Sequence, residues 1–151
     1  MIVTSAKNYL RAFIYKLRYP KATIARGACI NSESVLGSNT VIGEGSVLNH
    51  STLGNDATVH ADCTIEDSSF GQGLKIEKNA RLCNVRAGDV VNIRADCTIS
   101  DANLECAITV HSRCHLYRVT IGKYSFVAQD SQLSMVDIGR FSLLDRICSA
   151  A

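Results

Sequence analysis

The sequence predicts an all-β solenoid, in which short strands repeat and successive coils stack on one another. The main observation is a 17-residue period between Leu36 and Leu144, traced by steps of six, six and five residues. Of the 20 positions visited, 19 are Leu, Ile, Val or Phe, although only 46% of the chain is apolar. A fixed period of this size is typical of a solenoid. The positions are Leu36, Ile42, Leu48, Leu53, Val59, Ile65, Phe70, Ile76, Leu82, Ala87, Ile93, Ile99, Leu104, Val110, Leu116, Ile121, Val127, Leu133, Ile138 and Leu144.

Two further columns support the same period. A glycine follows the first apolar residue of most repeats, at Gly37, Gly54, Gly71, Gly88, Gly122 and Gly139, and Glu105 breaks the series. Because glycine tolerates backbone angles that a side chain forbids, this column predicts a recurring corner. Small residues tend to stand four places after an apolar residue, at Thr40, Ser46, Ala57, Cys63, Ala80, Cys97, Cys114, Ser125, Ser131, Ser142 and Cys148.

The resulting motif is an aliphatic residue, often glycine, two variable residues, a small residue and one more variable residue. It resembles the hexapeptide repeat of the left-handed parallel β-helix transferases over residues 24–148. The resemblance implies a single-stranded left-handed parallel β-helix that repeats at the 17-residue period, one triangular coil per repeat. The left-handed sense comes from the family, because the general preference for crossovers predicts the right-handed one. We expect residues 1–22 to form a cap and residues 23–151 to form the β-helix domain.

Residues 5–19 predict an amphipathic helix, with Leu10, Phe13, Ile14 and Leu17 along one stripe and Pro20 at its end. Residues 1–26 hold six basic residues and no acidic ones, whereas the remainder holds 10 basic and 14 acidic. One interpretation is a lid that buries the stripe on the open end of the first coil. The other is an interfacial helix that holds the protein near anionic lipid. Both functions are compatible.

The seven cysteines indicate core packing rather than disulfides or metal binding. Four of them, Cys63, Cys97, Cys114 and Cys148, fall in one small-residue column, where a thiol behaves as a small hydrophobe. Cys29, Cys83 and Cys106 lie off this column and form no ligand set. Reduced thiols and the absence of a signal peptide or membrane-spanning run predict a cytoplasmic protein. Because the N-terminal helix is basic, the predicted location includes peripheral contact with the inner face of the membrane.

The segments Ile121–Val127 and Val136–Ser142 are similar to the stretch that precedes the active-site region in the sugar and xenobiotic O-acetyltransferase branch. In that branch another coil and a loop with a catalytic His follow. Here the chain stops at Ala151, so the resemblance implies a C-terminally truncated member.

Asn and Asp recur three places after an apolar residue, where they fit left-handed turns. These positions are Asn39, Asp56, Asp62, Asn79, Asp96 and Asp130.

His50 is the candidate general base for acetyl transfer to a hydroxyl group. It resembles the His in the Val-x-His-Asp-x-x-Ile-Gly motif of the sialic-acid-type O-acetyltransferases, with Ser51 in place of the Asp. Asp67 stands one repeat further on and is expected beside the imidazole, where it could hold the useful tautomer. The alternative is a solvated corner His beside a solvated Asp.

Two other histidines stand one repeat away from a charged residue, His60 from Glu77 and His111 from Arg94. This spacing predicts ordinary pairs on the surface. A three-His metal site like that of the related γ-type carbonic anhydrases does not match their spacing, so no metal is expected. The chain has no Trp and is only 6% aromatic, which argues against nucleic-acid stacking.

The resemblance implies an acetyl-CoA-dependent O-acetyltransferase that acts on a sugar hydroxyl in surface polysaccharide biosynthesis, assembled as a homotrimer. The rival hypothesis is a non-catalytic or truncated β-helix protein of the same fold, such as a scaffold, because the catalytic His loop is missing. No residue is assigned to cofactor binding.

Overall fold

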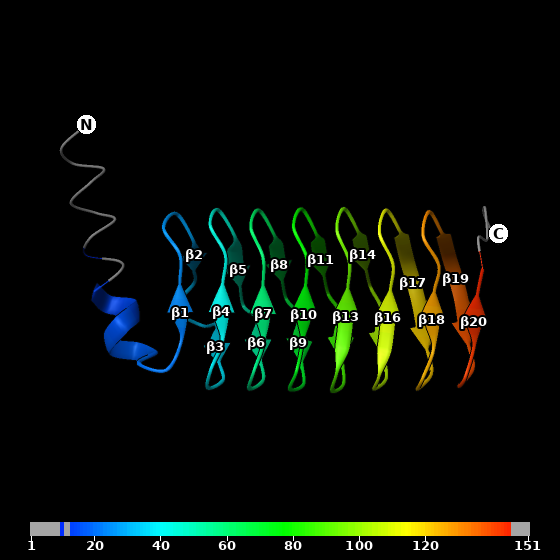
Figure 1. Ribbon diagram of the computed structural model, residues 1–151, viewed down its shortest axis with the longest axis horizontal. Coiled ribbons are helices and arrows are strands. Elements are labelled where there is room, and N and C mark those ends of the chain that lie inside the picture. The colour runs from blue at the N-terminus through cyan, green and yellow to red at the C-terminus, as the bar shows by residue number, and fades with distance from the viewer. Residues whose placement is uncertain (1–9, 11–12, 146–151) are drawn as a thin grey trace.

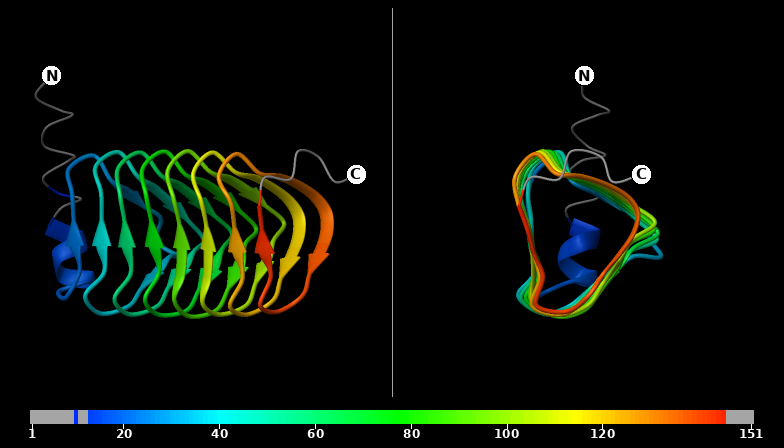
Figure 2. Two further views of the ribbon diagram at one scale, coloured as in Figure 1. Left: turned by 45° about the vertical axis from the view of Figure 1, so that its right-hand side comes forward. Right: turned by 90° about the vertical axis from the view of Figure 1, so that its right-hand side faces the viewer.

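The computed structural model of the chain, which describes residue 10 and residues 13–145, is a parallel β-solenoid with a triangular cross-section (Figures 1 and 2). Eight strands form one wall, in the order β1-β4-β7-β10-β13-β16-β18-β20. Twelve strands form the second sheet, which covers the other two walls. All pairings are parallel, and from Leu36 onward each residue pairs with its equivalent in the next repeat, as in Leu82↔Ile99. The predicted solenoid and its period are therefore confirmed.

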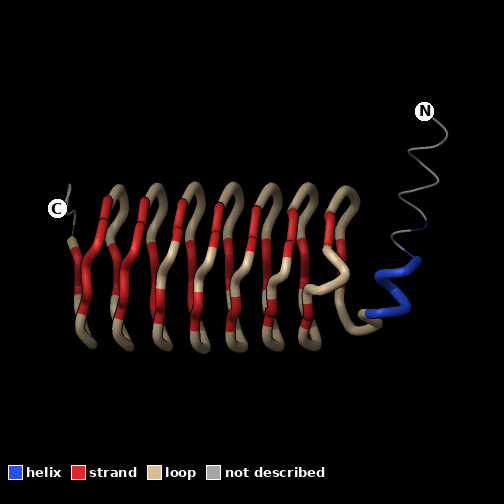
Figure 3. The backbone as a smooth tube through the Cα atoms, turned by 180° about the vertical axis from the view of Figure 1, so that it is seen from behind, coloured by secondary structure: helices blue, strands red, loops and turns tan. Residues whose placement is uncertain are grey.

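The strands are short and recur once per wall. The eight-stranded wall holds β1 (Thr23–Ile24), β4 (Val41–Ile42), β7 (Thr58–Val59), β10 (Lys75–Ile76), β13 (Val91–Ile93), β16 (Ile108–Val110), β18 (Phe126–Val127) and β20 (Leu143–Leu144). The second wall holds β2 (Cys29–Ile30), β5 (Val47–Asn49), β8 (Thr64–Glu66), β11 (Arg81–Cys83) and β14 (Thr98–Ser100). The third holds β3 (Val35–Leu36), β6 (Thr52–Leu53), β9 (Ser69–Phe70), β12 (Arg86–Ala87) and β15 (Asn103–Leu104). The longer β17 (His115–Ile121) and β19 (Gln132–Ile138) run through both of these walls (Figure 3).

The periodic apolar residues fill the inside of the prism. Most of them are buried, and Ala87 and Leu144 pack partly buried against the core. The small-residue column lines the same interior, since Cys63, Ala80, Cys97 and Cys114 are each 0% exposed. Its thiols also donate hydrogen bonds to corner carbonyls, as in Cys97 Sγ to His111 O at 2.9 Å. The core interpretation of these cysteines is confirmed, and Cys148 lies outside the described residues.

The glycine column has a different physical basis from the one predicted. Positive φ values occur at Gly27, Gly45 and Gly73, none of which belongs to the column. A Cβ added at Gly54 would instead lie 2.5 Å from the backbone carbon of Gly71 in the next coil. Close approach of neighbouring coils therefore excludes a side chain here. All six predicted Asn and Asp positions have positive φ, as do residues of other types at further corners.

The amphipathic helix predicted over residues 5–19 is not supported in that form. Residues 5–9 and 11–12 lie outside the described residues, and the helix seen at 13–18 is short. It lies at the N-terminal end of the prism, inside the triangular outline viewed along the axis (Figure 2). The predicted stripe does not face the coil; Tyr15 and Tyr19 pack against the core instead. The physical reason is that the entry coil presents polar backbone groups, which the tyrosine hydroxyls satisfy.

Replacing Gly54 by Ala is expected to lower the free energy of unfolding by about 1–3 kcal/mol, the usual cost of overpacking. The Gly139→Ala variant is the matched control, because a Cβ at Gly139 meets nothing within 4 Å. Urea unfolding followed by circular dichroism measures both variants. Equal stability of the two variants would contradict the contact between the glycines.

Iodoacetamide is expected to alkylate the exposed Cys83 in the native protein while Cys63, Cys97 and Cys114 stay unmodified. Burial raises the pKa of the Cys63 thiol, and all three core thiols are 0% exposed, so the reagent has no access to them. Peptide mass spectrometry before and after unfolding in guanidinium measures the labelling. Core thiols that react in the native state as fast as Cys83 would refute the stacked interior.

Candidate functional site

From the second coil onward, one corner of each coil is made by a single residue in the left-handed conformation. It joins the second and third walls and accounts for the five-residue step of the period. In the second coil β5 ends at Asn49, His50 makes the corner, and β6 begins at Thr52. The φ values in this column lie between 45° and 55°. The corner residues are His50, Asp67, Asn84, Asp101, Arg118 and Met135.

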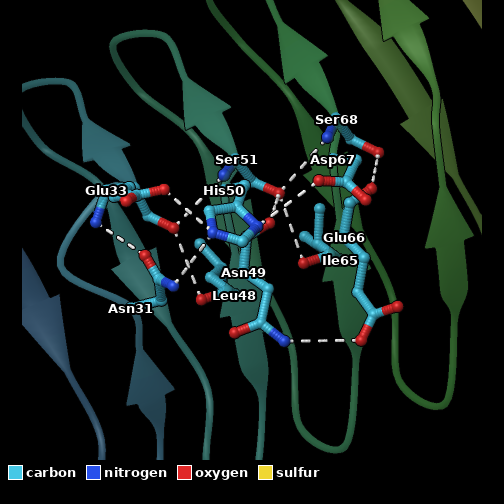
Figure 4. Close-up of polar contacts among 11 residues, drawn as sticks. Asn31, Glu33, Leu48, Asn49, His50, Ser51, Ile65, Glu66, Asp67 and Ser68 are labelled. Atoms are coloured by element: carbon cyan, nitrogen blue, oxygen red, sulfur yellow. Dashed lines mark hydrogen bonds and ion pairs between the residues drawn. The ribbon is translucent and has the colours of Figure 1, made fainter.

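Buried serines hold the backbone beneath His50 in place. Ser51 is 0% exposed, and its Oγ donates a hydrogen bond to the carbonyl of Asn49 at 2.7 Å. The backbone N–H of Ser51 in turn donates to Oγ of Ser34 at 3.2 Å, and that of Ser68 donates to Oγ of Ser51 at 3.4 Å. This ladder fixes the corner, and with it the direction of the imidazole (Figure 4).

His50 lies between two carboxylates that come from the coils on either side. Its Nδ1 is 3.4 Å from Oδ1 of Asp67, and its Nε2 is 2.9 Å from Oε2 of Glu33. The amide of Asn31 is also near Nε2, at 3.5 Å (Figure 4). The structure therefore places Asp67 beside His50, as the repeat predicts. Whether either residue is catalytic stays a prediction.

Glu33 and Asn31 are site residues that the sequence pattern did not predict. Glu33 stands one repeat before His50, so the same step taken backwards points to it. The entry coil, however, pairs Ile30 with Leu48, which is one residue more than the period. The 17-residue period of the later coils therefore does not fix the register of the entry coil. For this reason the period alone did not identify Glu33 as a neighbour of His50.

The site is open to solvent, which limits what its ion pairs contribute to stability. The side chains of His50, Glu33 and Asp67 are 52%, 71% and 66% exposed. Exposed pairs of this kind contribute about 0–1 kcal/mol. Only an imidazolium can donate to both carboxylates, whereas a neutral imidazole donates from one nitrogen and accepts at the other. For His50 to accept a proton at Nε2, Glu33 has to leave that nitrogen.

His60 and His111 lie along another edge of the prism, where β7 and β16 end. Arg94 Nη1 lies 2.7 Å from Oε1 of Glu77, and this hydrogen bond lowers the pKa of the Glu77 carboxyl. His60 is exposed nearby, and the His111 ring lies 5.4 Å from that of Phe126. Among the described residues, His111 Nδ1 is the buried side-chain nitrogen without a hydrogen-bond partner. No group of three or more His, Cys, Asp or Glu side chains in the described part could hold a metal ion.

Comparison with known families adds to this geometry. The family described as "GMPPB C-terminal domain" matches residues 16–115. No curated protein sequence matches the chain.

Among solved structures, LpxA of Acinetobacter baumannii is 17% identical and has a TM-score of 0.55, over 82% of this chain and 65% of that one. The UDP-N-acetylglucosamine O-acyltransferase LpxA of Moraxella catarrhalis is 17% identical, with a TM-score of 0.54, over 83% and 65%. The Arabidopsis UDP-N-acetylglucosamine acyltransferase is 13% identical, with a TM-score of 0.54, over 85% and 61%. The chain thus spans about 65% of the length of the two bacterial enzymes, and the likeness shows a shared left-handed β-helix fold.

Proposed function

We propose that the chain, which belongs to the family of the GMPPB C-terminal domain, transfers an acetyl group to a sugar hydroxyl. Its fold is similar to that of the UDP-N-acetylglucosamine O-acyltransferase LpxA. The observation that carries the proposal is the imidazole of His50 with Asp67 on its Nδ1 at an exposed corner. Acetyl-CoA is the proposed donor. The proposed acceptor is a sugar nucleotide or a similar precursor in surface polysaccharide biosynthesis.

In the proposed reaction the acceptor hydroxyl attacks the thioester carbonyl carbon of acetyl-CoA. His50 accepts the hydroxyl proton at Nε2 as the new C–O bond forms, and Asp67 stabilises the resulting imidazolium through Nδ1. The tetrahedral intermediate collapses, the C–S bond breaks, and the proton passes to the departing CoA thiolate. The hydroxyl must first replace the Glu33 carboxylate at Nε2.

A second copy of the chain is part of the proposal. The side chains of His50, Glu33 and Asp67 are all more than half exposed. A single prism therefore forms only one side of a binding site for the two substrates. Exclusion of water strengthens electrostatic interactions in an active site. In a homotrimer, a neighbouring prism that covers this corner would form the other side of the site.

The contact of Glu33 with Nε2 favours a second candidate, a non-catalytic structural domain. In this conformation both ring nitrogens face carboxylates, so neither is placed to accept a proton. The matching family is moreover described as a C-terminal domain, which is the place of a module joined to another unit. The two candidates differ in whether the chain turns over acetyl-CoA.

We expect His50→Ala to lower kcat/KM for acetyl transfer to UDP-sugars by about 10²–10⁴-fold, the usual contribution of a general base. Asp67→Asn should give a smaller fall, because it removes the charge beside Nδ1 but not the base. Mass spectrometry of the acetylated sugar measures turnover, and His60→Ala, an exposed histidine on another edge, is the matched control. Unchanged turnover in His50→Ala removes His50 from the mechanism. A wild-type protein without turnover on any sugar acceptor supports the structural domain.

Glu33→Ala should raise kcat/KM by up to about fivefold, because an exposed ion pair that competes for Nε2 is worth at most about 1 kcal/mol. The same assay measures the change, with circular dichroism to show that the fold is intact. A fall in turnover would show instead that Glu33 assists the reaction.

A further inference from the structure

The short helix at 13–18 turns an apolar stripe away from the solenoid. Phe13, Ile14 and Leu17 are 62%, 49% and 69% exposed, and Leu10 one turn earlier is 61% exposed. Large apolar side chains that are exposed together mark interaction sites more often than isolated ones do. The predicted lid would have buried these side chains on the first coil, but they are exposed.

The opposite face of the helix is tied to the entry coil. The hydroxyl of Tyr15 donates to the carbonyl of Ile30 at 3.0 Å and accepts from its N–H at 2.8 Å. Tyr19 donates to the carbonyl of Ser34, and Arg18 to that of Ser32. Turning the stripe inward would break these hydrogen bonds. The helix therefore presents its apolar side chains outward in a fixed orientation.

All charged residues that precede Glu33 in the sequence are basic. Lys16, Lys21 and Arg26 among them are exposed. Lysine is depleted in the centre of protein–protein interfaces, whereas a basic face beside Phe and Leu is typical of helices that lie in a membrane interface. Each cation near an anionic surface adds about 1 kcal/mol of attraction. The charge therefore favours lipid headgroups over a second protein.

We propose that the N-terminal end of the prism docks on an anionic lipid surface, with Phe13, Ile14 and Leu17 inserted among the headgroups. The helix lies in the plane of the interface and its cations contact lipid phosphates. The proposed contact is peripheral. Among the described residues, no helix has the length and hydrophobicity of a membrane span. The inference is independent of acetyl transfer.

Vesicle flotation with the full chain tests the proposal without any substrate. We expect binding to phosphatidylcholine vesicles that contain about 30% phosphatidylglycerol, and at least about tenfold weaker binding to pure phosphatidylcholine, since the cations supply much of the attraction. The double variant Phe13→Ser with Leu17→Ser should lose about tenfold or more of the anionic-vesicle binding, because two apolar side chains no longer insert. Lys16→Gln with Lys21→Gln should also weaken binding and reduce its salt dependence.

The matched control is Phe141→Ser with Leu143→Ser, which removes two side chains that are each 75% exposed at the far end of the prism. It should bind vesicles as the wild type does, and circular dichroism should show the same β content for all variants. The proposal is overturned if the wild type fails to bind anionic vesicles at low salt, or if the far-end control loses binding equally. It is also overturned if sedimentation shows an oligomer that only the Phe13/Leu17 variant dissociates, without vesicle binding, because the stripe is then a chain–chain interface.

Discussion

The register between neighbouring coils is the constraint on which the structure depends. Such short strands have no stability of their own, and they persist here because each backbone N–H meets a carbonyl of the adjacent coil. The N–H of Thr58 donates to Leu74 O at 2.8 Å, and that of His60 donates to Ile76 O at 2.9 Å. A shift of one residue would turn every inward side chain outward. Chemistry is therefore confined to the outward positions and the corners, where residues one repeat apart become neighbours.

This constraint explains how much of the fold and the site the sequence predicts. Inward positions, the cysteine column and the pairing of His50 with Asp67 all follow from counting, because the period states which residues stack. Counting does not reveal why a position has its residue type. The glycine column looked like a set of turns, yet it marks places where two backbones approach too closely for a Cβ. Likewise, the five-residue step does not by itself show that one left-handed residue makes that corner.

Backbone strain is not what distinguishes His50. Arg118 and Met135 make the same corner in later coils, with φ of 51° and 55°, so other residue types adopt the same backbone conformation. The strain belongs to the corner and is shared along the prism, so it carries no functional information about one residue. What is particular to His50 is its neighbours, which the entry coil and the third coil supply from opposite directions.

The same short segment, residues 30–34, connects the helix to the candidate site. The backbone of Ile30, Ser32 and Ser34 bonds the helix side chains, while the alternate residues Asn31 and Glu33 direct their side chains toward His50. The segment bends in a turn at Ser32 and Glu33, where the N–H of Ser34 donates to the carbonyl of Asn31 at 3.1 Å. An i, i+3, i+4 pattern could identify the apolar stripe, but the unsatisfied backbone groups of this segment decided which helix face docks. One continuous segment thus anchors the helix and supplies two of the side chains around His50.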